Sequence, residues 1–137
     1  RYELEQALIN GSLEVKDLEV AWNDMFKRDF GYAVDRPSNG VLQDVHWSVG
    51  LFGYFPTYSL GNIYAGCLEK AIRSELPDLN LEYSKGNVKR ATTWLRENLQ
   101  MYGGLRDPEQ TISFATGEMP NEEPLLNYLD KKFNDLI

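Results

Sequence analysis

Apolar residues recur every three to four positions along most of this chain, which is the spacing of one face of a helix. The first such repeat covers residues 1–9 and stops at Asn10. A second repeat covers residues 15–29 and is followed by Gly31, a residue type that commonly ends helices. The sequence therefore predicts two amphipathic helices before residue 31.

One long helix and three shorter ones are predicted in the rest of the chain. Thr57 is expected to cap the long helix, which runs to about Leu76 before Pro77 ends it. Its apolar stripe includes Cys67, which we expect to be buried as a small hydrophobic side chain. The first shorter helix is predicted to begin at a cap formed by Asn87. The second should begin at the pair Asp107-Pro108 and end near Gly117, and the third should cover residues 123–137.

Strand patterns are almost missing from the sequence. Apart from a short ambiguous run at residues 51–55, no stretch alternates apolar and polar positions over a useful length, so the predicted fold class is all-α. A chain of 137 residues suits one domain better than two, and we expect a single helical domain over residues 1–137. Because the chain starts inside a helical repeat without a cap, we expect it to be a fragment of a longer protein.

Composition narrows the classes of partner. Fourteen basic residues against 21 acidic ones give a net charge of -7, and no basic patch indicates nucleic-acid binding. No stretch approaches the roughly 20 apolar residues that are needed to cross a bilayer. Cys67 is the single cysteine, so no intrachain disulfide can form. We expect a soluble protein of the reducing cytoplasm, without nucleic-acid or membrane partners.

Candidate chemistry is concentrated between residues 40 and 62. Aromatic residues alternate there with glycines, which let a backbone approach a ligand closely, and with polar side chains. His46 is the single histidine, whereas hydrolytic zinc sites usually take three protein ligands. The Gly-x-Ser-x-Gly motif of serine hydrolases is missing as well. This chain is therefore not expected to contain a complete hydrolytic site.

One run in this segment resembles a known family. Residues 40–47 read Gly-Val-Leu-Gln-Asp-Val-His-Trp, which matches the Gly-x-x-Gln-Asp-x-His-Trp signature of the carboxypeptidase Taq family. Residues 52–62, 115–118 and 126–129 also resemble family segments. The resemblance covers the whole chain but only the C-terminal part of a family member. It implies one helical lobe of a clamp peptidase related to neurolysin, with a glycine- and aromatic-rich loop between helices.

The resemblance implies a metallocarboxypeptidase that releases single amino acids from peptide C-termini. In the family, zinc, or another divalent metal such as cobalt, is held by a His-Glu-x-x-His helix and a later glutamate, and the glutamate of the motif activates a water molecule. These residues would precede Arg1, so the fragment is expected to bind no metal and to be inactive alone. The implied partners are peptide substrates, the missing N-terminal lobe and a second copy in a full-length homodimer.

The resemblance assigns catalytic roles to His46 and Tyr58. In the related clamp peptidases, a histidine and a tyrosine twelve positions later face the scissile bond, and these two residues reproduce the spacing. A continuous helix of that length would separate them by about 18 Å, so a break at Gly50, Gly53 and Pro56 is expected to bring them together. Tyr58 would donate to the oxyanion or to the terminal carboxylate of the substrate, and His46 would make a second polar contact.

Three neighbours complete the predicted site. Gln43 and Asp44 are expected to orient His46 or to cap a turn, with a contact to the substrate as the alternative, and Tyr54 belongs either to the substrate site or to the core. We also expect an exposed apolar patch at residues 46–58, where the missing lobe would pack. The alternative interpretation is a non-catalytic helical interaction module derived from that lobe. A metal-independent hydrolase is disfavoured because no nucleophile–base pair is evident.

Overall fold

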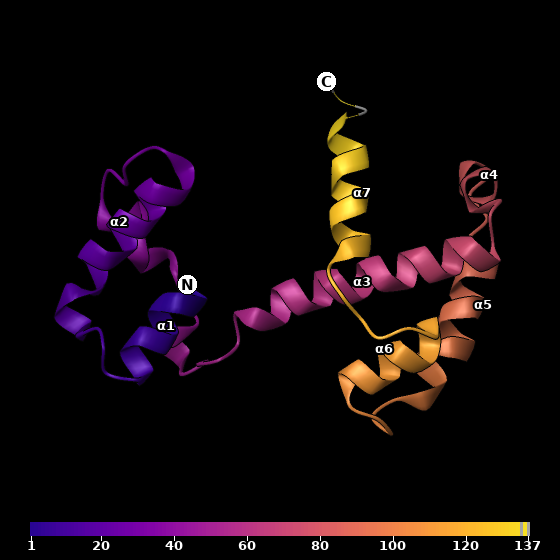
Figure 1. The fold of residues 1–137 in the computed structure, drawn as a ribbon, viewed down its shortest axis with the longest axis horizontal. Coiled ribbons are helices and arrows are strands. Elements are labelled where there is room, and N and C mark those ends of the chain that lie inside the picture. Colours follow the sequence, from indigo (N-terminus) through magenta and orange to yellow (C-terminus); the bar gives the residue numbers. More distant parts are fainter. Residues whose placement is uncertain (135, 137) are drawn as a thin grey trace. The chain divides into compact units, whose positions relative to one another are not determined.

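The computed structural model describes residues 1–134 and 136, and Figure 1 shows their arrangement along the chain. Every regular element in these residues is helical, which confirms the all-α prediction. The ambiguous run at residues 51–55 forms turns rather than a strand. The chain divides into two compact units, Arg1–Tyr58 and Ser59–Ile137. A single domain over the whole chain stays a prediction.

Two helices open the first unit. Helix α1 (Tyr2–Ile9) is followed by the 3₁₀ turn η1 (Val15–Asp17) and by α2 (Leu18–Phe30). Gly31 ends α2 in the left-handed backbone region, with φ at 78°, and its amide donates to the carbonyl of Lys27. Both predicted helices are present, although a 3₁₀ turn replaces the expected first turn of the second.

Three short 3₁₀ turns carry the chain from α2 to the next helix: η2 (Pro37–Asn39), η3 (Val41–Gln43) and η4 (Trp47–Val49). Gly40 is buried between the first two of these turns. A Cβ atom at this position would lie 2.8 Å from Cγ1 of Val34 and 3.3 Å from Nε1 of Trp22. The turns therefore pack against α2 only because residue 40 has no side chain.

The long helix α3 (Pro56–Glu75) begins in the first unit and continues into the second. Thr57 is its second residue, and the Thr57 hydroxyl donates to the carbonyl of Tyr54 at 2.6 Å. The prediction that Thr57 caps this helix is therefore wrong. Pro56 takes the first helical position instead, where a missing amide proton costs nothing.

The second unit adds helices α4 (Leu79–Ser84), α5 (Lys89–Asn98), α6 (Pro108–Thr116) and α7 (Glu123–Asn134). The sequence did not predict α4, because six residues are too few to show a helical period. Asp107 caps α6 as predicted and accepts from the amide of Gln110 at 2.8 Å. Asn87 accepts from the amide of Lys89 at 3.2 Å, but Val88 is the cap residue of α5. Residues 135 and 137 of the predicted last helix lie outside the described residues.

An apolar core lies within the second unit. It consists of buried side chains from α3, α4 and α5, namely Ile72, Leu79, Ala91 and Trp94. Helix α7 crosses α3 at Gly66, where a Cβ atom would lie 2.8 Å from the backbone nitrogen of Leu125. Cys67 is buried as predicted, and its thiol donates to the carbonyl of Asn121 at 3.3 Å. Among the helices described, none has both the length and the apolar character to span a membrane.

Candidate functional site

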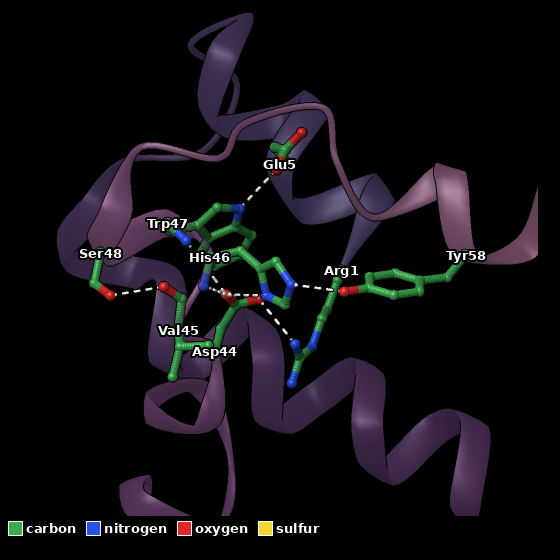
Figure 2. Close-up of polar contacts among 8 residues, drawn as sticks. All are labelled: Arg1, Glu5, Asp44, Val45, His46, Trp47, Ser48 and Tyr58. Atoms are coloured by element: carbon green, nitrogen blue, oxygen red, sulfur yellow. Dashed lines mark hydrogen bonds and ion pairs between the residues drawn. The ribbon is translucent and has the colours of Figure 1, made fainter.

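His46 and Tyr58 are in direct contact in the first unit. Nε2 of His46 lies 3.1 Å from the hydroxyl oxygen of Tyr58, and the two rings meet edge to face (Figure 2). The predicted break between them is confirmed. Gly50 and Gly53 adopt left-handed backbone, with φ at 77° and 73°, and α3 starts only at Pro56. Because glycine adopts this backbone readily, the loop can turn back and place the phenol against the imidazole.

Asp44 contacts His46 on the other side of the imidazole. Its Oδ1 accepts from the backbone amide of His46 at 2.7 Å and from that of Trp47 at 3.3 Å. The same oxygen lies 3.5 Å from Nδ1 of His46, close enough for electrostatic attraction, although Nδ1 has no well-aligned hydrogen bond. The Asp44 side chain is only 1% exposed. It therefore closes the turn before η4 and faces the imidazole from a fixed position.

Arg1 balances the charge of this buried carboxylate. Its Nη1 donates to Oδ2 of Asp44 at 3.0 Å, which leaves Oδ1 for the turn (Figure 2). The guanidinium also lies over the rings of Phe55 and Trp22, at 4.4 Å and 5.1 Å from their centroids. A carboxylate that leaves water needs such partners, because an unpaired buried charge is costly.

A second buried carboxylate, Glu5 on α1, holds the loop that follows His46. Its Oε2 accepts from the indole nitrogen of Trp47 at 2.6 Å, and its Oε1 accepts from the backbone amide of Gly53. Glu5 is 6% exposed. The sequence analysis missed both Arg1 and Glu5. The available signal was their spacing of four residues, which places both charges on one face of the first predicted helix.

Of the remaining predicted residues, Tyr54 lies beside the pair and Gln43 lies apart from it. The ring of Tyr54 stacks against His46 at 5.6 Å and meets Tyr58 edge to face at 5.4 Å. Phe55 packs edge to face against His46 at 4.7 Å. Gln43 is exposed at the end of η3, and its side chain makes no hydrogen bond within the described residues. Three aromatic rings therefore surround the imidazole without a contribution from Gln43.

The side chains around the pair leave much apolar surface in contact with solvent. Between residues 45 and 58 the large apolar side chains with at least 42% of their surface exposed are Val45, Val49, Leu51, Phe52, Tyr54 and Tyr58. Trp47 and Phe55 in the same segment are only partly exposed, and the contiguous apolar patch expected at residues 46–58 stays a prediction. Tyr58 as a whole is 52% exposed.

The described residues do not fit a metal ion. No group of three histidine, cysteine, aspartate or glutamate side chains within residues 1–134 and 136 is arranged to hold one. His46 has a single carboxylate beside it, and Arg1 already pairs with that group. The site built by this chain is therefore a set of hydrogen-bonding groups with aromatic walls.

Known proteins similar to this chain are metallocarboxypeptidases. The profile of the family described as "Carboxypeptidase Taq (M32) metallopeptidase" matches residues 1–133. Thermostable carboxypeptidase 1 from Thermus thermophilus is 40% identical over 133 residues, and carboxypeptidase 1 from Bacillus subtilis is 36% identical over 136 residues. These matches cover 97% and 99% of this chain but only 26% and 27% of the relatives, so the chain spans about a quarter of their length.

Solved structures show the same fold. The M32 carboxypeptidase from Deinococcus radiodurans R1 superposes with a TM-score of 0.94 at 33% identity, over 98% of this chain and 27% of that one. The Pyrococcus furiosus carboxypeptidase superposes with a TM-score of 0.92 at 31% identity, over 96% and 26% of the two chains. The range matched by the family profile includes the His46–Tyr58 pair and the two carboxylates that support it.

Proposed function

This chain belongs to the carboxypeptidase Taq (M32) metallopeptidase family, and we propose that it supplies substrate-side residues of an enzyme that releases single amino acids from peptide C-termini. The observation that carries the proposal is the contact between Nε2 of His46 and the hydroxyl of Tyr58. Since the chain spans 26% of a curated relative, the rest of the active site would lie elsewhere in the intact protein.

The protonation state of His46 decides what Tyr58 can do. Oδ1 of Asp44 lies 3.5 Å from Nδ1, and the role of Nε2 depends on which ring nitrogens carry a proton. When the imidazole is neutral with its proton on Nδ1, Nε2 accepts a hydrogen bond from the Tyr58 hydroxyl. When the imidazole is charged, Nε2 donates to the phenol oxygen, and the phenol proton is free to reach a substrate oxygen.

In the charged arrangement Tyr58 can act as a hydrogen-bond donor to the substrate. Its target would be the oxyanion that forms when the peptide carbonyl is attacked, or the terminal carboxylate. His46 would make a second polar contact to the bound peptide. Tyr54 would line the substrate path, because it stacks on His46 and is 42% exposed. Gln43, with an exposed side chain, stays a proposed substrate contact.

The metal that the family implies would be bound outside this chain. In the intact protein a divalent ion, zinc or cobalt, would supply the activation of water for attack on the peptide bond. Because the described residues contain no group of three suitable ligands, we expect the isolated fragment to be inactive. We further propose a cytoplasmic homodimer with a clamp-like second lobe, on the strength of the family resemblance and the single cysteine.

Tyr58→Phe in the full-length protein tests the role of the phenol. Loss of one oxyanion donor typically costs about 100- to 1000-fold in kcat, and we expect a loss of this size. Tyr32→Phe is the matched control, because it makes the same change at an exposed tyrosine of the same unit and should leave kcat unchanged. The assay follows release of the C-terminal amino acid from a peptide, with and without a chelator. An unchanged kcat/KM in Tyr58→Phe would refute the assignment.

The exposed apolar side chains between residues 45 and 58 also suit the alternative, a non-catalytic interaction module. The same assay separates the two functions. An interaction module would release no amino acid even when divalent metal is supplied, and the sequence upstream of Arg1 would lack a His-Glu-x-x-His motif. Chelator-sensitive release of C-terminal residues excludes it.

A further inference from the structure

We propose that Glu5 is a positioning residue that sets the placement of Tyr58 against His46, an inference that rests on the function proposed above for this pair. Neither ring donates a hydrogen bond to Glu5 itself. Its carboxylate instead holds the backbone and the indole that lie next to the site, and it does so from a helix at the other end of the first unit's sequence.

Glu5 bridges the two ends of the loop between the site residues. Trp47 directly follows His46, and Gly53 directly precedes Tyr54. One carboxylate oxygen accepts from the Trp47 indole at 2.6 Å, and the other accepts from the Gly53 amide. A single buried group therefore fixes both neighbours of the stacked His46 and Tyr54 rings.

The loop at residues 47–53 has little other support. Within the loop, the amides of Val49, Gly50 and Leu51 bond to carbonyls of His46 and Trp47, which shapes the turn but does not attach it to the rest of the unit. Leu51 and Phe52 are exposed. Among the described residues, the two bonds to Glu5 are thus the hydrogen bonds that anchor this loop to a distant part of the chain.

The burial of Glu5 also argues for a bridging role. Asp44 has an arginine partner, whereas Glu5 has no ion pair within the described residues and is satisfied by two N–H donors. Burying a carboxylate without a cation is costly. An apolar side chain would fill the space at lower cost but would accept no hydrogen bond, so only a carboxylate joins Trp47 to Gly53 through two oxygens.

Glu5→Gln in the full-length protein tests the proposal. The amide keeps the length of the side chain but has one acceptor oxygen, so one of the two N–H donors loses its partner. A misplacement of about 1 Å can cost about 100-fold in rate, and we expect kcat to fall about 10- to 100-fold while KM changes less than about threefold. Glu3→Gln is the matched control: it removes the same charge from an exposed position of α1 and should leave both constants unchanged.

A double-variant cycle separates positioning from a general loss of structure. If Glu5 acts through the phenol, Glu5→Gln should add little to the loss already caused by Tyr58→Phe. An equal proportional loss in the wild-type and Tyr58→Phe backgrounds would overturn the proposal, because it would mean that Glu5 acts independently of Tyr58.

A spectroscopic readout keeps this test distinct from that of the proposed function. In protein labelled with 3-fluorotyrosine, the fluorine resonance of Tyr58 is assigned by its loss in Tyr58→Phe. We expect this resonance to shift in Glu5→Gln and to stay in place in Glu3→Gln. An unshifted resonance overturns the positioning role. If Tyr58→Phe retains full activity but the resonance shifts, the catalytic assignment fails while the placement of the ring by Glu5 is supported.

Discussion

The two units of this chain are stabilised by different kinds of contact. In the first unit, the carboxylates of Glu5 and Asp44 are buried and bond to N–H groups far along the chain or in the next turn. In the second unit, the buried cluster is apolar and consists of Ile72, Leu79, Ala91 and Trp94. Hydrogen bonds are directional, whereas apolar burial is not. The site is therefore positioned by directional bonds, and the helices beyond it are stabilised by burial.

This difference predicts that substitutions in the two units have separable effects. Changes to the apolar cluster should lower stability and leave the His46–Tyr58 pair in place. Changes to the polar contacts should disturb the pair and leave the stability of the second unit unchanged. Hydrogen exchange of backbone amides reports on both units in one sample, so it tests whether their stabilities respond separately.

The largest stability effect is expected from Leu79→Ala. Leu79 is 1% exposed and belongs to the apolar cluster, so its truncation should cost about 2–5 kcal/mol. Protection of amides in the second unit should fall accordingly. Leu81→Ala, at an exposed position of the same helix, is the control and should have little effect. Equal losses for the two variants would contradict the assignment of the core.

A smaller effect, restricted to the first unit, is expected from Asp44→Asn. The amide keeps one acceptor oxygen for the turn but loses the charge that pairs with Arg1 and faces His46. Hydrogen bonds to charged groups contribute about 1.5–3 kcal/mol, and amides of the first unit should lose protection by about this amount.

The control for this variant is Asp24→Asn, which removes an exposed charge from α2. It should leave exchange unchanged in both units. If Asp44→Asn also weakened the apolar cluster of the second unit, the proposed separation between polar and apolar stabilisation would be wrong.

The smallest effect on stability is expected from removing a surface ion pair of the second unit, and this effect depends on pH. Arg90 donates to Asp78 at 2.6 Å and lowers the pKa of this carboxyl below its ordinary value of 3.8. A lowered pKa means that the contribution to stability is present above pH 3.8 and is lost as the pH falls through the folded-state pKa. Both side chains are solvent-exposed, so the contribution is small.

Asp78→Asn should therefore make the loss of stability in acid slightly shallower, as measured by urea unfolding at a series of pH values below 4. Asp130→Asn, an exposed aspartate of α7, serves as the control. A steeper acid dependence in Asp78→Asn would mean that the sign of the pKa shift is wrong.

Several helix ends were predictable because their signals are local. Gly31 and Gly117 end α2 and α6 in the left-handed backbone region, and Asp107 caps α6 through its own side chain. Thr57 was assigned wrongly because Pro56 can itself begin a helix, which places the first helical residue two positions earlier than a Thr57 cap would. Helix α4 was missed because its burial depends on Leu79 meeting α3 and α5, which no six-residue pattern reveals.

The helical class and the family motif could be predicted from the sequence, because periodicity and a contiguous motif are local features, and the resemblance to related peptidases then implied the His46–Tyr58 pair. The contacts that hold the pair in place depend on tertiary packing. Arg1 meets Asp44 across 43 positions, and Glu5 reaches Trp47 and Gly53 across 42 and 48. Contacts at such separations depend on how the whole unit packs, and no local pattern of residues specifies them.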